Sequence, residues 1–245
     1  MRTADPLLPL LDLPRVDESV ANVRTDIDEL RRHRVLRQHS AAVSAEAALH
    51  GARASAALEG ADHPLESVRS GGVTDPVVQG ALRVSTALGS SIATWERAPL
   101  QVLARLHSLA AAGLLPPDRL GRPAGSADRL AALARLVASD SDVPAVILAA
   151  VVHGELLALD AFPAANGILA RAAARLVLIT RGLDPKALSV PEVGHAAAVE
   201  EYRGAAAAYA NGTTEGVQRW LLHCCAATRL GAQEGLAICE AARRR

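Results

Sequence analysis

Residues 159–171 read Leu-Asp-Ala-Phe-Pro-Ala-Ala-Asn-Gly-Ile-Leu-Ala-Arg, and this stretch decides the fold prediction. It joins two segments with a helical residue pattern, 144–159 before it and 168–181 after it. Asparagine, here Asn166, tolerates a left-handed backbone conformation, and Gly167 has no side chain to obstruct a close approach. The stretch therefore predicts a tight loop between two core helices, with the free amide groups of the second helix facing the loop.

The rest of the chain has the same helical character. Alanine and leucine dominate, aromatic residues are 2%, and β-branched residues rarely alternate, which predicts an all-α fold. Apolar spacing and helix-ending signals predict further helices over residues 18–38, 40–59, 75–88, 100–113, 127–139, 192–210 and 213–242.

Three segments are not expected to be long helices. Pro6, Pro9 and Pro14 predict that residues 1–17 form an extended N-terminal arm, ahead of one helical domain over residues 18–245. Residues 115–126 hold three prolines and two glycines and predict a surface loop without an edge strand. Gly71-Gly72 predicts another loop.

Composition narrows the function classes. Acidic and basic residues balance at 26 each, so nothing favours a nucleic-acid partner. The apolar run 143–159 is interrupted by His153 and Glu155 and is too short to span a bilayer, so no membrane partner is expected. The N-terminus lacks signal-peptide character, and the three cysteines cannot all pair within one chain. We therefore expect a cytoplasmic protein.

Residues 159–171 resemble the active-site loop of the Fic (Fido) family, whose pattern reads His-Pro-Phe-x-Asp/Glu-Gly-Asn-Gly-Arg-x-x-Arg. Phe162, Asn166, Gly167 and Arg171 match the pattern. The flanking helices, a Leu-His pair at 106–107, and Tyr202, Tyr209 and Trp220 extend the resemblance from about residue 40 to residue 227. The resemblance implies a single-domain, all-α Fic-like fold with the motif loop between two core helices. The alternative is an alanine-rich helical protein with a coincidental Asn-Gly turn.

The resemblance also implies a chemistry. Working members transfer AMP or another phosphate-containing group from a nucleotide to a protein hydroxyl, with the motif histidine as base and the acidic motif residue holding magnesium. Asn166, Gly167 and Arg171 are retained and could hold a nucleotide or another anion, because a helix N-terminus and an arginine both bind phosphate. The alternative is a purely structural turn, with Arg171 paired to a carboxylate.

The mismatches fall on the catalytic positions. Asp160 stands at the position of the histidine base, and a carboxylate accepts a proton less readily than an imidazole. Ala164 replaces the magnesium ligand, and Ile168 replaces a phosphate-binding arginine. The sequence therefore favours a degenerate, inactive Fic-fold protein with a binding or regulatory role, no magnesium site and at most weak ATP binding. The alternative is a divergent transferase that uses Asp160 as its base.

Ser55, Glu59 and Gly60 fit the family's inhibitory pattern, Ser/Thr-x-x-x-Glu-Gly/Asn. In the family this glutamate pairs with the last arginine of the motif, here Arg171. We therefore expect Glu59 to lie beside Arg171, and the end of its helix to cover the motif loop. The alternative is an ordinary surface glutamate. His223-Cys224-Cys225 lacks zinc-site spacing, so no metal site is expected there. The partner protein is not identified by the sequence, and self-association stays open.

Overall fold

The computed structural model describes residues 5–244 of the chain. Within that range every regular element is a helix, and loops join the helices. The elements in chain order are η1 (Leu8–Asp12), α1 (Val16–Arg32), α2 (Leu36–Leu58), α3 (Leu65–Arg69), α4 (Pro76–Trp95), α5 (Pro99–Ala111), η2 (Pro117–Arg119), α6 (Ala127–Ala138), α7 (Ala145–Leu159), α8 (Asn166–Thr180), α9 (Pro191–Ala197), α10 (Val199–Ala210) and α11 (Thr214–Arg243). Residues 5–244 contain no β-strand, only an isolated bridge between Ala112 and Leu115. The all-α prediction is confirmed.

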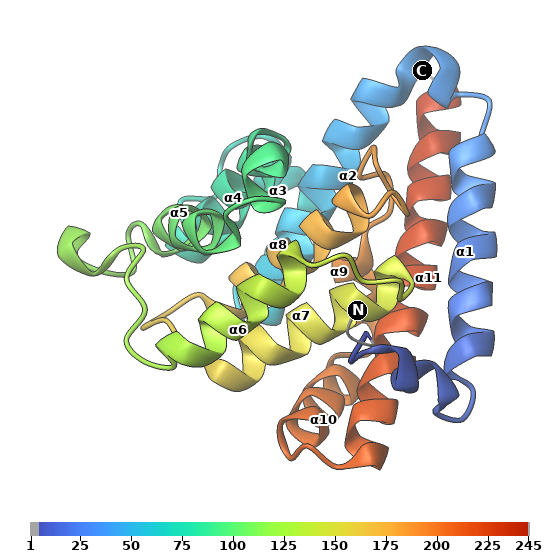
Figure 1. The fold of residues 1–245 in the computed structure, drawn as a ribbon. Coiled ribbons are helices and arrows are strands. Elements are labelled where there is room, and N and C mark those ends of the chain that lie inside the picture. The colour runs from blue at the N-terminus through green and yellow to red at the C-terminus, as the bar shows by residue number, and fades with distance from the viewer. Residues whose placement is uncertain (1–4, 245) are drawn as a thin grey trace.

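The centre of the molecule is α7, the apolar helix before the motif loop. Every residue from Val146 to Gly154 is buried, so this part of the helix is covered on all sides, as its predominantly apolar sequence predicts. It packs most extensively against α8, on the other side of the loop. Figure 1 shows α7 crossing the middle of the molecule, with α1 and α11 along one edge and α4 and α5 at the opposite side. The two helices that flank the motif loop are therefore both core helices.

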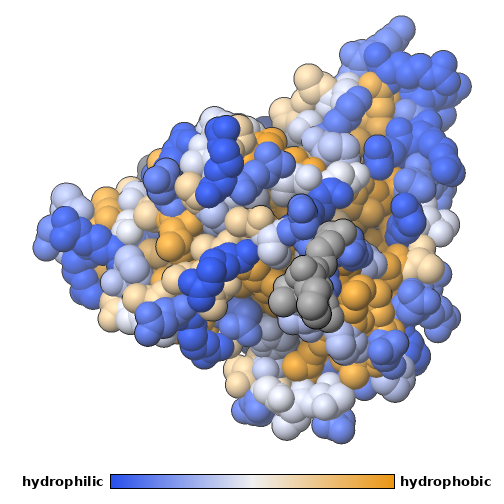
Figure 2. Space-filling model, viewed as in Figure 1, coloured by the Kyte–Doolittle hydropathy of each residue, from blue (hydrophilic) through white to orange (hydrophobic). Residues whose placement is uncertain are grey.

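The outer edge of the molecule is formed by α1, which packs lengthwise against α11. Val16, Val23, Ile27 and Leu30 are the buried residues of α1. Its charged residues face outward, and the corresponding edge in Figure 2 is mainly hydrophilic. One continuous set of buried apolar side chains extends from α1 to α11. No helix within residues 5–244 is both long enough and apolar enough to cross a membrane.

Residues 5–17 of the predicted N-terminal arm differ from the prediction, and residues 1–4 of the arm lie outside the described residues. Residues 8–12 form a 3-10 helix instead of an extended chain, and α1 begins at Val16, before residue 18. Proline near the start of the 3-10 helix suits its first turn, because the fixed φ of proline is compatible with that conformation. Asp5 anchors the segment, since its carboxylate accepts hydrogen bonds from the hydroxyl of Ser141 at 2.7 Å and the amide of Asp142 at 2.8 Å.

Two predicted helices are each divided into two. The segment 18–38 breaks at His33, whose ψ of 127° is not helical and whose Nε2 contacts Glu240 Oε1 at 2.9 Å. The segment 192–210 breaks at Ala198, which has φ −132° and ψ 51°. Near each break a histidine contacts α11, His33 through Glu240 and His195 through His223, and local periodicity does not reveal such contacts. The structure also adds α3, in a segment to which the sequence assigned no element.

Candidate functional site

The motif loop is a short turn between α7 and α8, with left-handed residues at both ends. Asp160 follows α7 with φ 42°, and Ala165 precedes α8 with φ 57°. The sequence had placed the special backbone conformation at Asn166, but the structure places it at Ala165, and Asn166 is the first residue of α8. The Asn166 amide instead holds the loop closed. Its Oδ1 accepts from the Phe162 amide at 3.1 Å, and its Nδ2 donates to the Phe162 carbonyl at 2.6 Å.

Phe162 anchors the loop in the core. Its side chain is 5% exposed and its ring stacks on the imidazole of His107, with centroids 4.4 Å apart. Nδ1 of His107 accepts a hydrogen bond from the amide of Gly121 at 2.9 Å. Burial lowers the pKa of His107, which keeps the ring neutral and able to accept that bond. His107 therefore connects the motif loop with the loop 112–126.

The loop 112–126 lies directly on the motif loop. The amide of Ala124 donates to the carbonyl of Ala161 at 2.7 Å. The loop contains the 3-10 turn η2 and no strand, as its prolines and glycines predict. Its contact with the motif loop was not predicted, because the pattern of residues 115–126 carries no sign of its neighbours.

Arg171 is the central charged residue of the site, and its side chain is 2% exposed. Its Nε donates to the Ser55 hydroxyl at 2.9 Å, and its Nη2 donates to the Ser55 carbonyl at 3.0 Å. Nη1 donates to the Tyr202 hydroxyl at 3.1 Å, and Nη2 also contacts Glu59 Oε1 at 2.8 Å. The guanidinium is therefore held on three sides, as a buried arginine requires.

Glu59 lies where the sequence predicts, beside Arg171. It caps the C-terminus of α2, and Gly60 with φ 93° turns the chain away from the helix. A methyl group added at Gly167 would collide with the Glu59 carboxylate, so this carboxylate sits directly against the Gly167 backbone. Ser55, Glu59 and Gly60 thus bring the end of α2 over the N-terminus of α8. That N-terminus is the part of the site that favours an anion.

A buried polar cluster lies behind Arg171. The Tyr202 hydroxyl is 3.0 Å from Nε2 of His153, and burial raises the pKa of Tyr202 and lowers that of His153 well below its usual value. The Tyr202 hydroxyl therefore stays protonated and donates a hydrogen bond to the neutral imidazole of His153. Its oxygen accepts a hydrogen bond from Arg171. Nδ1 of His195 and Nε2 of His223 lie 3.0 Å apart in the same cluster. The role of Tyr202 as a partner of Arg171 was not predicted.

A second buried ion pair lies one helical turn along α8. Nη1 of Arg175 is 3.1 Å from Oε2 of Glu192, and both side chains are less than 10% exposed. Nη2 of Arg175 also donates to the carbonyl of Ala187 at 3.2 Å. This pair fastens α8 to α9 and to the loop before it. Arg175 is a structural cation, distinct from Arg171, whose guanidinium lies beside Gly167 at the start of α8.

The three mismatched motif positions differ in their surroundings. Asp160 is exposed at the end of α7, and Ala164 is half-buried. Ile168 is 2% exposed and part of the hydrophobic core. Within residues 5–244, no group of three histidine, cysteine or acidic side chains is arranged to hold a metal ion. The thiols of Cys224, Cys225 and Cys239 are buried and free.

No protein-family model and no curated protein sequence matches this chain. Solved structures do resemble it. A Fic family protein from Desulfovibrio desulfuricans has a TM-score of 0.70 and 19% identity, over 89% of this chain and 74% of that protein. A fragment of Fic-1 from C. elegans has a TM-score of 0.71 and 17% identity, over 96% and 75%. A variant of that fragment has a TM-score of 0.64 and 16% identity, over 95% and 74%. At these identities the likeness shows the fold.

Proposed function

Because the chain has the Fic fold, we propose that it is an inactive member of this structural class that acts by binding a partner protein and does not transfer AMP. The observation that carries the proposal is the position of Glu59. Its carboxylate lies against Gly167 and 2.8 Å from Arg171, at the helix N-terminus that would otherwise receive a phosphate. An incoming nucleotide would have to displace a carboxylate that already satisfies a buried cation.

The residues of the loop support the same proposal. Asp160 places a negative charge at the exposed end of α7, where incoming phosphates would be repelled. Ala164 offers no oxygen ligand for magnesium, so the charge of a triphosphate would stay unneutralised. Ile168 is buried and supplies no cation. Nucleotide binding is therefore expected to be weak, dependent on Arg171 and insensitive to magnesium.

The proposal is tested by incubating the purified protein with labelled ATP, magnesium and a cell lysate. We expect no labelling above background for the wild type, and none for Glu59→Gly, in which the covering carboxylate is removed. The Arg171→Ala variant is the control for nucleotide binding measured by calorimetry. Labelling that disappears in Asp160→Ala would overturn the proposal and identify a divergent transferase that uses Asp160 as its base.

A further inference from the structure

A groove of about 490 Å³ lies between the N-terminal part of α2 and the C-terminal part of α11, and none of its lining residues belongs to the motif loop. Its floor is made of small and branched apolar side chains, Ala42 and Val43 from α2 and Ala237, Ile238 and Ala241 from α11. Ala42, Ala237 and Ala241 are exposed. The volume and the apolar lining are within the range of ligand-binding clefts.

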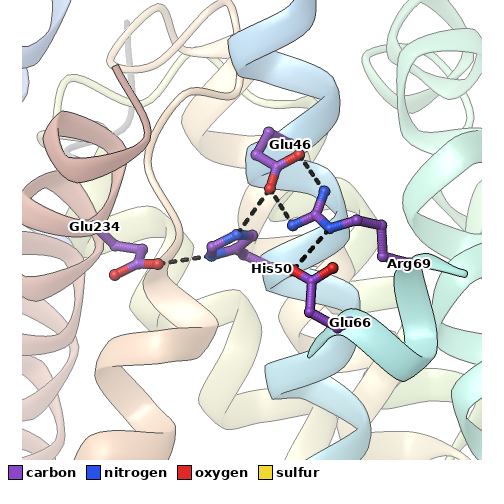
Figure 3. Close-up of polar contacts among 5 residues, drawn as sticks. All are labelled: Glu46, His50, Glu66, Arg69 and Glu234. Atoms are coloured by element: carbon purple, nitrogen blue, oxygen red, sulfur yellow. Dashed lines mark hydrogen bonds and ion pairs between the residues drawn. The ribbon is translucent and has the colours of Figure 1, made fainter. Parts of the chain in front are cut away.

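One end of the groove is closed by a charge cluster, shown in Figure 3. Nδ1 of His50 lies 2.6 Å from Oε1 of Glu234 on α11, and its Nε2 lies 3.2 Å from Oε1 of Glu46, one turn earlier on α2. Arg69 from α3 pairs with Glu46 and with Glu66. The carboxylates in the groove are thus matched by their own cations, and this end carries little free charge.

The other end of the groove is basic. A second hollow of about 460 Å³ shares His39 and Ala242 with the first and is lined by Arg34, Arg37 and Arg243. Arg34 and Arg37 are exposed, and neither forms an ion pair with any residue from 5 to 244. The combined groove therefore runs from a neutral end, over an apolar floor, to an end with two exposed arginines that have no carboxylate partner among residues 5–244.

The same pair of helices already holds a helix away from the groove. The short helix α9 packs against both α2 and α11, and Figure 1 shows it between them. None of its residues lines the groove. The helices α2 and α11 thus already accommodate one helix between them, and the exposed alanines of the groove leave room for the close approach of another. Residues 234–243 of α11 border the combined groove over about 14 Å, or about two and a half helical turns.

We propose that this groove is a docking site for an amphipathic helix of a partner protein, with small apolar residues on its contact face and acidic residues at the end that meets Arg34 and Arg37. Burial of the apolar face supplies the attraction. The charge pairing fixes the orientation of the helix in the groove and speeds its association. The proposal does not depend on the state of the motif loop.

The probes are synthetic peptides of about 14 residues with an alanine and leucine stripe at helical spacing. Two peptides carry a glutamate pair, at the amino or the carboxyl terminus, which covers both orientations in the groove. Lysine replaces glutamate in the matched controls. By fluorescence anisotropy at low salt, we expect one glutamate peptide to bind roughly tenfold more tightly than its lysine counterpart, with the gap narrowing in high salt.

Two variants locate the binding. Ala237→Trp fills the exposed floor of the groove and is expected to abolish binding, whereas Gln233→Trp, exposed on the same helix outside the groove, is not. The double change Arg34→Glu and Arg37→Glu is expected to reverse the preference in favour of lysine. The matched double change Arg122→Glu and Arg135→Glu alters two exposed residues outside the groove, and it is expected to leave the preference for the glutamate peptide unchanged.

Three results would overturn the proposal. The first is that neither glutamate peptide binds. The second is binding that is equal in the wild type and Ala237→Trp. The third is self-association of the protein that Ala237→Trp abolishes, because the groove would then be the contact between two copies of this chain.

Discussion

Oε1 of Glu59 lies 2.8 Å from Nη2 of Arg171, although the two residues are 112 positions apart in the sequence. The side chain of Arg171 is 2% exposed and that of Glu59 is 30% exposed, so the pair is shielded from water mainly on the arginine side. Another ion pair in the protein has the same distance between nitrogen and oxygen but is exposed to solvent. Glu201 and Arg219 are also 2.8 Å apart, but about half of each side chain is exposed. Because the two ion pairs have equal distances and different exposure, comparing them shows how burial alone affects the contribution of an ion pair to stability.

Glu59→Gln is expected to destabilise the protein by about 1–3 kcal/mol, less than for a fully buried pair because Glu59 is partly solvated and Arg171 keeps Ser55 and Tyr202. Glu201→Gln is expected to have no measurable effect. Urea unfolding of the wild type and both variants at neutral pH measures the difference. Equal losses in the two variants would mean that burial of Arg171 does not control the strength of its pair.

Phosphate should partly rescue the first variant. Removal of the Glu59 charge leaves a buried cation beside the N-terminus of α8, and both favour an anion. We expect added phosphate to stabilise Glu59→Gln more than the wild type at equal ionic strength. Glu201→Gln controls for the general effect of phosphate on folding. The same gain in all three proteins would show that no anion binds at Arg171.

Ala165→Gly is expected to stabilise the protein by about 0.5–1 kcal/mol, because relief of a left-handed alanine outweighs the entropy that glycine adds to the unfolded chain. The φ of Ala165 is 57°. Ala164 has no positive φ, so Ala164→Gly should be destabilising. Thermal unfolding of the two variants checks the opposite signs. A loss in both variants would indicate that the methyl group of Ala165 makes packing contacts that outweigh the strain.

The His50 cluster should make stability depend on pH. The hydrogen bond to Glu234 is the main cause that raises the pKa of His50, and Arg69 and His50 respectively lower the pKa values of Glu46 and Glu234. The His50 contribution is therefore complete below its ordinary pKa of about 6.5 and is lost as the pH rises through the raised value. The contribution of Glu46 and Glu234 to stability is present above the ordinary pKa of a glutamate and is lost as the pH falls through their lowered pKa values.

We therefore expect His50→Gln to reduce the free energy of unfolding most between about pH 5 and 6.5 and progressively less at higher pH. Urea unfolding from pH 5 to 9 measures the difference between wild type and variant. Burial also lowers the pKa values of His153 and His195, which destabilises both proteins as the pH falls, so this effect cancels in the difference. A difference that grows with pH would contradict the assigned charge of His50.

The sequence predicts some parts of this site well and others not at all. The helices on each side of the motif loop follow from apolar runs and end signals within a few residues, so local information suffices. The pairing of Glu59 with Arg171 was inferred from two short patterns. Tyr202 lies 31 residues beyond Arg171, and nothing local marks it as an arginine partner. The breaks at His33 and Ala198 likewise lie beside contacts with α11 that the local sequence does not reveal.

His107 illustrates the same limit. Its helix and its burial were predictable, because it lies on the apolar face of a helical segment. Its contacts with Phe162 and Gly121 connect two loops that are far apart in sequence, and only the fold brings them together. The left-handed conformation of Ala165 was also missed, because alanine rarely adopts it and Asn166 is the more usual candidate.

Restoration of side chains that match the family pattern tests whether their loss causes the proposed inactivity. The triple change Glu59→Gly, Asp160→His and Ala164→Glu removes the covering carboxylate and supplies a base and a metal ligand at positions that are not fully buried. We expect calorimetry to show magnesium-dependent ATP binding in this variant, at least about tenfold tighter than in Glu59→Gly alone. Magnesium should have no effect on Glu59→Gly.

Ile168 sets the limit of that restoration. Because its side chain is 2% exposed within the core, Ile168→Arg is expected to destabilise the protein by several kcal/mol. The cation at this position therefore cannot be restored without repacking around α8, and transfer should stay weak in the triple variant even where nucleotide binds. If the triple variant binds ATP no better than Glu59→Gly, the backbone of the loop is the obstacle. The left-handed Ala165 would then be the first residue to change.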